Sequence, residues 1–269
     1  MKLLFTLVSL LFISSLYAAK PSLDLLTQSQ ADAVSKEFSG NFIHTNVSPA
    51  SSLGDIFGFE VGLVAGLSET PEIDKLSKTF DASATIDKIP HAGAIGSVSV
   101  PFGITAEMTY VPEVGSDVKF KHLSYGAKWT FSRFLPVPLD IAIRLHGSSS
   151  TLSYTDVINN TSTGNTDVNS TIAYDTSSFG YNLSVSKKLL FVEPYIGLGR
   201  VSTDTDIKAS ASTTVSIFTF SSASSYTSEN SGTHLFAGVN LNLFLLKIGA
   251  EYSNVMGVDR YSGKLSFYF

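Results

Sequence analysis

The chain ends in DRYSGKLSFYF, Asp259 to Phe269, and this stretch alternates between two kinds of side chain. Mainly apolar residues occupy one side of a two-residue period and mainly polar residues the other: Tyr261, Gly263, Leu265, Phe267 and Phe269 against Ser262, Lys264, Ser266 and Tyr268. Such alternation is typical of a β-strand whose two faces meet different surroundings. About 9–11 tilted residues carry a strand across the hydrocarbon layer of a membrane. Because backbone groups in lipid must all be paired, the stretch predicts one strand of a closed transmembrane β-barrel.

A terminal Phe preceded by alternate apolar residues resembles the assembly signal of the outer-membrane β-barrels of Gram-negative bacteria. On this resemblance, we expect the outer-membrane assembly machinery to read Tyr261, Leu265, Phe267 and Phe269. The resemblance also implies that the protein lies in the outer membrane, where lipid and lipopolysaccharide surround it.

The composition fits one large all-β domain in a membrane. Of the 269 residues, 43% are hydrophobic and 15% are charged, and the mean hydropathy is +0.20. After the first 19 residues, however, no apolar run approaches the ~18 residues that a transmembrane helix needs. The chain has no cysteine, which excludes disulfides, thiolate metal sites and a lipidated N-terminal cysteine. A net charge of −5 argues against nucleic-acid binding.

Three segments follow from the order of the sequence. Residues 1–19 hold Lys2, an apolar stretch and two alanines, which predicts a secretory signal peptide, with a membrane anchor as the alternative. Residues 20–55 predict a helix over Ser22–Gly40 and then a polar stretch. This segment either remains in the periplasm or enters the barrel as a plug, and Lys36 and Glu37 are then candidates to pair with charges inside. Residues 56–269 form the barrel.

The barrel region predicts an antiparallel up-and-down fold of ten strands with both chain ends in the periplasm. Alternating rows mark the strands near 56–67, 91–100, 104–111, 118–131, 139–146, 179–185, 191–201, 235–243, 248–252 and 259–269. Short connections alternate with long ones near 68–92, 153–170 and 202–232, and the first long connection holds a short helix that begins at Pro71. Twelve strands would result if Asp206–Tyr226 formed a further membrane-spanning hairpin.

Polar and charged residues fall on the face opposite the apolar rows, which we expect to line the lumen. These candidates are Glu60, Glu107, His122, Lys128, Asp140, Arg144, Glu251 and Lys264. The interior of a small barrel is little wider than its side chains, so mixed charges there can fill it with ion pairs and exclude a wide pore. A soluble β-sandwich would alternate too, but the signal peptide and the terminal Phe favour the membrane barrel. Arg200 breaks the pattern, which predicts a position at the membrane interface.

The sequence carries no recognisable catalytic motif. None of the five histidines stands in a hydrolase or metalloprotease signature, and no cluster of metal ligands exists. A pair formed by His122 and Asp140 on neighbouring strands remains conceivable, since catalytic triads require no fixed spacing. We predict a protein without enzymatic activity, cofactor or metal.

The order of several segments extends the resemblance. An N-terminal helical segment, GFEVGLVAG (58–66), a VPFGI hairpin (100–104), EPYIGLGRV (193–201) and the terminal Phe resemble an uncharacterised family of Gram-negative outer-membrane β-barrels. The layout is more weakly similar to the long-chain fatty-acid transporters, which also carry an N-terminal plug but form a larger barrel. We therefore expect a narrow channel or carrier for a small solute. The alternative is a surface or structural barrel that transports nothing and acts through its external loops.

Overall fold

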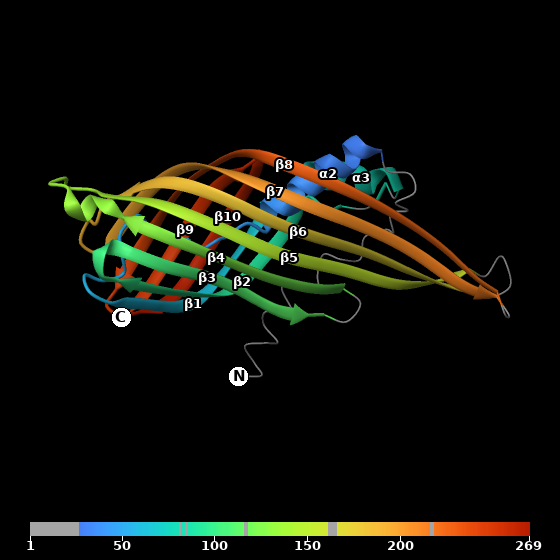
Figure 1. Ribbon diagram of the computed structural model, residues 1–269, viewed down its shortest axis with the longest axis horizontal. Helices are drawn as coiled ribbons and strands as arrows, with labels where there is room; N and C mark the ends of the chain where they lie inside the picture. Colours follow the sequence, from blue (N-terminus) through green and yellow to red (C-terminus); the bar gives the residue numbers. More distant parts are fainter. Residues whose placement is uncertain (1–26, 81, 84, 116–117, 161–165, 216–217) are drawn as a thin grey trace.

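The computed structural model describes residues 27–80, 82–83, 85–115, 118–160, 166–215 and 218–269, and its ten strands close into a barrel (Figure 1). The strands are β1 (Gly58–Glu69), β2 (Lys88–Val100), β3 (Ile104–Val114), β4 (Val118–Thr130), β5 (Asp140–Asn160), β6 (Thr166–Ser186), β7 (Val192–Val215), β8 (Phe218–Leu243), β9 (Leu246–Val255) and β10 (Val258–Tyr268). Each strand pairs antiparallel with its neighbours in sequence, and β10 pairs with β1. The predicted fold is confirmed, and the predicted signal peptide lies outside the described residues.

Apolar side chains cover the outside of the barrel, the reverse of a soluble protein. On β1, Phe59, Val61 and Leu63 are 40% exposed or more. On β10, Tyr261, Leu265, Phe267 and Phe269 are all more than half exposed. An outward apolar band on a closed barrel with a polar interior is the arrangement of a transmembrane β-barrel, so the strands cross a membrane.

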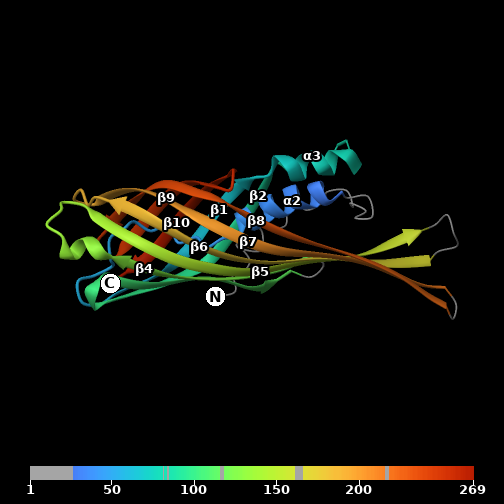
Figure 2. The same cartoon turned by 45° about the horizontal axis from the view of Figure 1, so that its top comes forward.

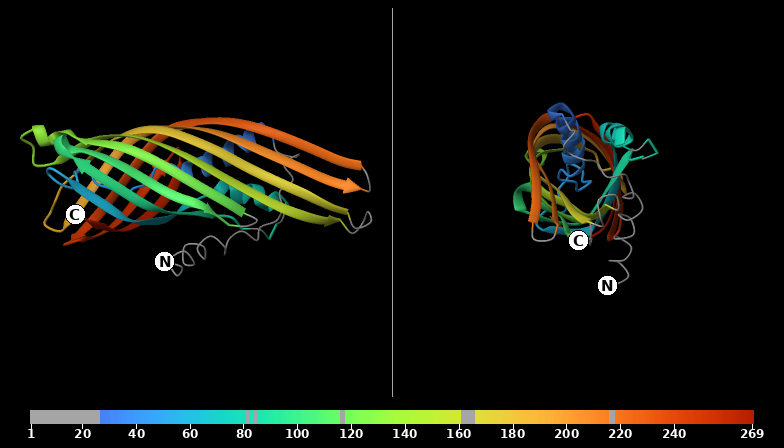
Figure 3. Two further views of the ribbon diagram at one scale, coloured as in Figure 1. Left: turned by 60° about the horizontal axis from the view of Figure 1, so that its bottom comes forward. Right: turned by 90° about the vertical axis from the view of Figure 1, so that its right-hand side faces the viewer.

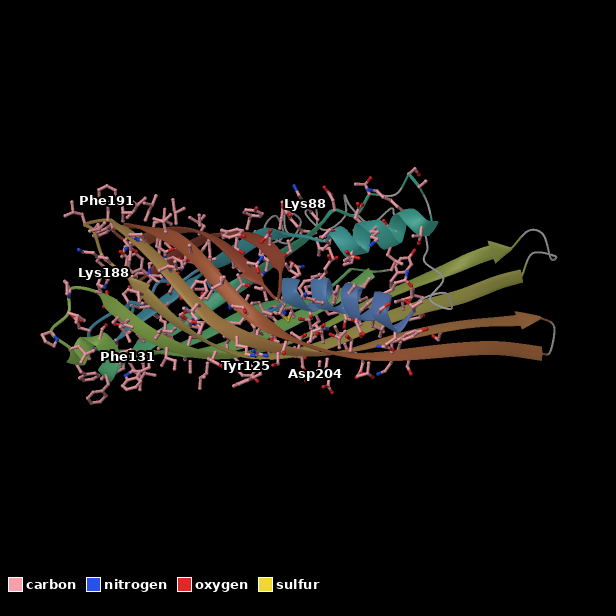
Figure 4. All side chains as sticks on the ribbon, turned by 90° about the horizontal axis from the view of Figure 1, so that it is seen from above. Lys88, Tyr125, Phe131, Lys188, Phe191 and Asp204 are labelled. Carbon is pink, nitrogen blue, oxygen red and sulfur yellow. The ribbon has the colours of Figure 1, made fainter. Side chains whose placement is uncertain are left out.

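The two ends of the barrel differ. Short connections and Phe269 lie at one end, called the turn end; at the other, the extension end, β5–β8 continue beyond the remaining strands (Figure 1). Phe131 and Phe191 lie at the turn end, whereas Tyr125 and Asp204 lie farther along (Figure 4).

The outer limit of the apolar band is visible along β7. Its outward residues change from Ile196 and Leu198 to exposed Arg200, Ser202 and Asp204. Arg200 pairs in register with Tyr181 of β6, and its Nη2 donates to Ser231 Oγ at 3.1 Å. An arginine beside a tyrosine at the edge of the band is typical of a membrane interface.

The strands β5–β8 are 21, 21, 24 and 26 residues long, about twice the length that crosses a membrane. Two loop predictions, near 153–170 and 202–232, are therefore wrong, because the described residues there, 153–160, 166–170, 202–215 and 218–232, prolong paired strands. A further membrane-spanning hairpin at 206–226 is wrong as well. The register between β7 and β8 continues without interruption from Val192 to Val215, since Ser and Thr pair well in a sheet whose outer face meets water.

Two helices lie at the extension end, α2 (Gln28–Asn41) and α3 (Pro71–Phe80), side by side (Figure 2). The short helix predicted from Pro71 is confirmed. Of the helix predicted over Ser22–Gly40, the described part begins after Thr27, whose side chain forms a capping box with Gln30, and the predicted cap Ser22 lies outside the described residues. It continues through Gly40, where a Cβ would lie 3.1 Å from Val258 Cγ2, so a small residue permits close packing on β10. In the described residues no helix is long and apolar enough to cross a membrane.

Seen along the barrel axis, α2 lies within the ring of strands (Figure 3). The described chain thus begins at the extension end, whereas Phe269 lies at the turn end (Figure 1). An even number of strands was expected to place both ends of the chain on one side of the membrane. β1 does begin beside the end of β10, at the turn end. The residues before Thr27 lie outside the described residues, and Thr27 itself lies at the other end. The reason is that the residues between α2 and β1 traverse the barrel, which adds one passage to the ten strands.

Candidate functional site

Residues 42–57, called the inner segment, connect α2 to β1 through the barrel interior. Its residues from Phe42 to Ser51 are all buried. Side chains of the wall hold its backbone carbonyls, since Ser148 Oγ donates to Phe42 O at 2.9 Å, Thr109 Oγ1 to Thr45 O at 2.8 Å and Thr130 Oγ1 to Ala50 O at 2.6 Å. In the described residues no strand of the barrel pairs with the inner segment. Side-chain contacts therefore hold it in place.

An ionic cluster centred on Glu107 of β3 joins the wall to the inner segment. The Glu107 carboxylate lies 2.8 Å from Arg144 Nε, 3.5 Å from Lys128 Nζ and 3.2 Å from His44 Nε2. Ser48 Oγ donates to Glu107 Oε1 at 2.9 Å and accepts from Arg144 Nη2 at 2.5 Å. Two of these five residues, His44 and Ser48, belong to the inner segment, so the cluster is complete only with that segment in place.

Lys128 adds a second kind of anchor. Its Nζ donates to the backbone carbonyls of Pro49 at 2.7 Å and Ser51 at 3.1 Å. The side chain is 2% exposed, and a buried ammonium needs such acceptors because it has lost its water.

A second ionic cluster lies at the seam where the barrel closes. The carboxylate of Glu60 on β1 is 2.7 Å from Lys264 Nζ of β10 and 3.3 Å from Lys247 Nζ of β9. Ser266 Oγ donates to the same carboxylate at 2.6 Å. These four residues link three adjacent strands and have no direct bond to the inner segment among the described contacts.

A third group of contacts fixes the junction of α2 and the inner segment. Arg260 Nη2 donates to Asn41 O at 3.1 Å and to Thr45 Oγ1 at 2.6 Å. His91 bridges Asn41 Oδ1 and Ser262 Oγ, at 3.0 and 2.9 Å. Ser68 Oγ also donates to Asn41 Oδ1. Asn41 therefore receives contacts from β1, β2 and β10.

The remaining predicted lumen residues take other positions. His122 points inward and its Nδ1 is 2.7 Å from Ser150 Oγ. Asp140 begins β5 at the turn end and is only partly buried, and the β4–β5 register places Ser150, not Asp140, beside His122. The conceivable catalytic pair is therefore not brought together. Glu251, partly buried, accepts a hydrogen bond from the Tyr195 hydroxyl at 2.8 Å.

A family model described as "Family of unknown function (DUF6588)" matches residues 27–262. The chain belongs to this family. The match to DUF6588 begins at the cap of α2, includes the inner segment and strands β1–β9, and ends within β10. The predicted membership of an uncharacterised β-barrel family is confirmed. No match was found among the curated proteins.

Solved structures of similar fold are all far from this DUF6588 chain in sequence. The attachment invasion locus protein Ail of Yersinia pestis is 9% identical with a TM-score of 0.31, covering 80% of this chain and 100% of its own. The toluene transporter TbuX of Ralstonia pickettii is 9% identical with a TM-score of 0.29, over 80% and 89%. The outer membrane protease OmpT of Escherichia coli is 7% identical with a TM-score of 0.24, over 83% and 100%. Scores this low do not bear on function.

The expected partners of Lys36 and Glu37 are wrong. Lys36 is exposed, and the Glu37 carboxylate accepts the backbone N–H groups of Glu72 and Ile73, both at 2.8 Å, at the start of α3. Burial raises the pKa of this carboxyl above its usual 4.5, although the two N–H groups act in the opposite direction. Glu37 thus joins the two helices outside the membrane band instead of pairing with lumen charges.

Sequence reasoning missed several residues of the interior. Lys247 and Arg260 share the inward period of Glu251 and Lys264, so the alternation was sufficient to find them. His44 and Ser48 lie in an irregular polar stretch with no period, and only the folded chain reveals their role. In the described residues no three His, Asp or Glu side chains are placed to hold a metal ion.

Proposed function

We propose that this protein is an outer-membrane channel for a small solute, with the inner segment as the element that obstructs its lumen. The apolar outer band and the alternating C-terminal strand support a location in the outer membrane, surrounded by lipid and lipopolysaccharide. The exposed row of Tyr261, Leu265, Phe267 and Phe269 supports recognition of the last strand by the assembly machinery.

One observation carries the proposal, namely how the inner segment is held. Wall side chains bind it through hydroxyls, Lys128 and the Glu107 cluster, and no backbone ladder ties it to the sheet. Water can replace such contacts one by one, whereas removing a strand would open the barrel. The segment can therefore move while the wall keeps its shape, which is what a plug requires.

A disulfide staple tests this proposal directly. Ser39 Oγ of α2 and Thr203 Oγ1 of β7 are 3.0 Å apart and buried, and the chain has no cysteine to interfere. We expect the Ser39→Cys, Thr203→Cys variant to be silent in planar bilayers when oxidised and to regain unitary conductance when reduced. The single variant Ser39→Cys is the matched control. Equal conductance in both redox states would refute the plug, and silence in every state would refute the channel.

A second function is favoured by the extension of β5–β8. These strands project past the membrane band with outward Asp204, Asp206, Lys208 and Glu229, all exposed to solvent. Such a polar hairpin pair is suited to contacts outside the cell, as in a surface protein that transports nothing. The test is to replace residues 208–226 with a short turn. If the protein acts through its extension, this variant should lose surface binding while its lumen stays unchanged. If the protein is a channel, the variant should keep its conductance.

A further inference from the structure

Three histidine rings form a line from the inner segment to two strands of the wall. His44 of the inner segment stacks on His146 of β5, with ring centres 5.8 Å apart. His146 in turn lies edge-on to His234 of β8, at 6.2 Å. All three residues are at most 5% exposed. The inner segment and the wall thus meet through imidazoles, the side chains whose charge ordinarily changes between about pH 5 and pH 8.

Glycines of the wall make room for these rings. The inward row across β4, β5 and β6 consists of Gly126, His146 and Gly180. A Cβ at Gly126 would lie 3.0 Å from His44 Nε2, and a Cβ at Gly180 would lie 2.5 Å from His146 Cε1. Each ring therefore occupies the space that a side chain at the glycine beneath it would need.

The two wall histidines differ from His44 in their hydrogen bonds. His44 lies 2.9 Å from Ser124 Oγ and 3.2 Å from Glu107 Oε2. Both ring nitrogens of His146 and of His234 are buried and have no hydrogen-bond partner among the described residues. A protonated imidazole carries a charge and two N–H donors, so in a buried place it needs acceptors. The closed arrangement provides none to these two rings and suits them only while they are neutral.

The charged groups around the two rings offer no free counter-charge. Those that face the rings from the packed elements are His44 of the inner segment, Glu107 of β3, Lys128 of β4, Arg144 of β5 and Arg260 of β10. The row from β6 and β7 adds only uncharged residues, namely Gly180, Asn182, Gly199 and Val201. Glu107 already balances Arg144 at 2.8 Å and Lys128 at 3.5 Å. Arg260 donates to two uncharged oxygens of α2 and the inner segment.

Two other carboxylates of the lumen lie farther along the sheet. Glu251 and Glu193 pair in register with residues of β8 that are four and six positions beyond His234. Both carboxylates accept hydrogen bonds from neighbouring hydroxyls. A proton on His146 or His234 would therefore add a positive charge beside the two arginines, with no carboxylate free to balance it.

We infer that His146 and His234 form an acid-operated switch that releases the inner segment. Protonation of either ring places a buried charge against His44 and the two arginines. The wall is held by a closed backbone ladder, whereas the inner segment is held by side-chain contacts alone, so the segment is the part that gives way. Its release admits water to both rings, and the released state therefore binds protons that the closed state does not. Acid favours the state that binds more protons.

The switch rests on the proposed function, in which the same segment obstructs the lumen. Its movement can nevertheless be measured without ion flux, because the chain has no cysteine. Ser51→Cys places a thiol in the inner segment, where Ser51 is 6% exposed. Ser225→Cys, on the exposed face of the β8 extension, is the reference. The two full-chain variants are placed in phosphatidylcholine nanodiscs and treated with dithiodipyridine, and the ratio of their reaction rates removes the pH dependence of the reagent.

We expect the rate ratio, Ser51→Cys over Ser225→Cys, to rise at least about tenfold between about pH 7 and about pH 5. The ratio should return to its first value on neutralisation. Heat-modifiable gel mobility should show a folded barrel throughout. A ratio that does not change with pH would overturn the switch. So would loss of the folded form in acid, because the whole barrel and not the inner segment would then respond.

Histidine variants assign the response to the two rings. His146→Gln combined with His234→Gln should keep the ratio low in acid, because glutamine takes no proton. Each single variant should reduce the rise, and the single variants replace the double one if it does not assemble. His122→Gln is the matched control and should retain the response, because His122 Nδ1 is 2.7 Å from Ser150 Oγ, which can accept from it.

An undiminished acid response in the glutamine variants would assign the effect to other groups, such as the carboxylates, and would overturn the switch. Loss of the response in His122→Gln would overturn the assignment to His146 and His234. Thiol accessibility and conductance separate the two proposals. A segment that acid releases in an electrically silent protein refutes only the channel. Conductance together with a ratio that does not depend on pH refutes only the switch.

Discussion

Lys264 Nζ lies 2.7 Å from Glu60 Oε1, and this ion pair connects the last strand of the barrel to the first. Both side chains are almost fully buried, and Lys247 of β9 approaches the same carboxylate at 3.3 Å. The lumen thus places one carboxylate between two ammonium groups where the sheet closes on itself. Closure depends on this cluster in addition to the backbone ladder between β1 and β10.

Removing the charge of Glu60 should strongly destabilise the barrel. Glu60→Gln leaves Lys247 and Lys264 buried without a counter-charge, which is expected to lower the free energy of unfolding by about 3–5 kcal/mol. Urea unfolding from lipid vesicles measures the change. Glu229→Gln, on the exposed face of the β8 extension, is the control and should change stability by less than about 0.5 kcal/mol. Equal stabilities of the two variants would contradict the role of the seam cluster.

Loss of the terminal residue should reduce the amount of assembled protein. Phe269 exchanges two backbone hydrogen bonds with Phe59, at 2.9 and 3.0 Å, and their rings are 5.0 Å apart. Deleting Phe269 is therefore expected to lower the folded fraction in purified membranes, measured by heat-modifiable gel mobility. Gly263→Ala is the suitable control because its Cβ would make only ordinary van der Waals contacts, 3.8 Å from Gly249 O and 3.9 Å from Ala65 O. Ser266→Ala is not neutral, since Ser266 Oγ donates to Glu60.

A charge on the outer face should be tolerated only beyond the apolar band. Leu265 is 52% exposed on the outside of β10, and Leu265→Arg is expected to destabilise the protein by about 2–4 kcal/mol near the midplane. Ser202→Arg, outward on β7 past Arg200, should cost less than about 1 kcal/mol. If unfolding in vesicles gives the reverse order, the membrane band has been misplaced.

Weakening one anchor of the inner segment should make openings more frequent. The Ser48 hydroxyl connects the segment to Glu107, Arg144 and, at 3.5 Å, Lys128, so Ser48→Ala removes three hydrogen bonds to charged groups. We expect about a tenfold rise in the open fraction in single-channel records. The Ser52 hydroxyl accepts a hydrogen bond from the exposed Arg133 at 3.3 Å, so the control variant Ser52→Ala should have little effect. An unchanged open fraction in Ser48→Ala would argue that the segment is permanently fixed.

The contact between α2 and α3 should respond to pH through Glu37. Burial raises the pKa of its carboxyl above 4.5 in the folded protein, so the folded state binds the proton more tightly than the unfolded state. Protonation of Glu37 therefore stabilises the folded state; this stabilisation is fully present below about pH 4 and is lost as pH rises through the raised pKa. Melting temperatures of the parent minus those of Glu37→Gln should therefore fall between about pH 4 and pH 7. A constant difference would exclude this titration.

The alternation of apolar and polar residues was sufficient to predict the strands of the membrane-spanning part of the barrel and the direction of their side chains. On β1 and β10 the lipid face and the lumen face alternate at every residue, so Phe59, Glu60 and Lys264 could be assigned to a face from the period alone. The extensions of β5–β8 were missed because Ser and Thr occupy both of their faces and only a few apolar residues, such as Ile172, Tyr174 and Ile207, point inward, so that no clear period of two distinguishes a strand from a loop. Pairing with a neighbouring strand decides the structure there.

The interior contacts could not be read from the sequence for a different reason. His44 and Ser48 precede the barrel in an irregular stretch, and their partners on β3 and β5 lie 63 and 96 residues away. Each contact depends on where the inner segment runs through the lumen, and that route follows from the closed barrel. The charge of Glu107 predicted an inward position, and its partners became evident only with the segment in place.

The passage of residues 42–57 through a ring that β1 and β10 close also constrains the order of assembly. The inner segment is synthesised first and β10 last, yet in the finished protein the closed barrel surrounds the inner segment. Either the sheet forms around the inner segment before β1 pairs with β10, or the part of the chain that precedes β1 is threaded through the closed barrel afterwards. A folded domain fused ahead of Thr27 is too wide for the interior of a ten-stranded barrel. If such a fusion protein still assembles into a closed barrel, its sheet must therefore have surrounded the inner segment before β1 paired with β10.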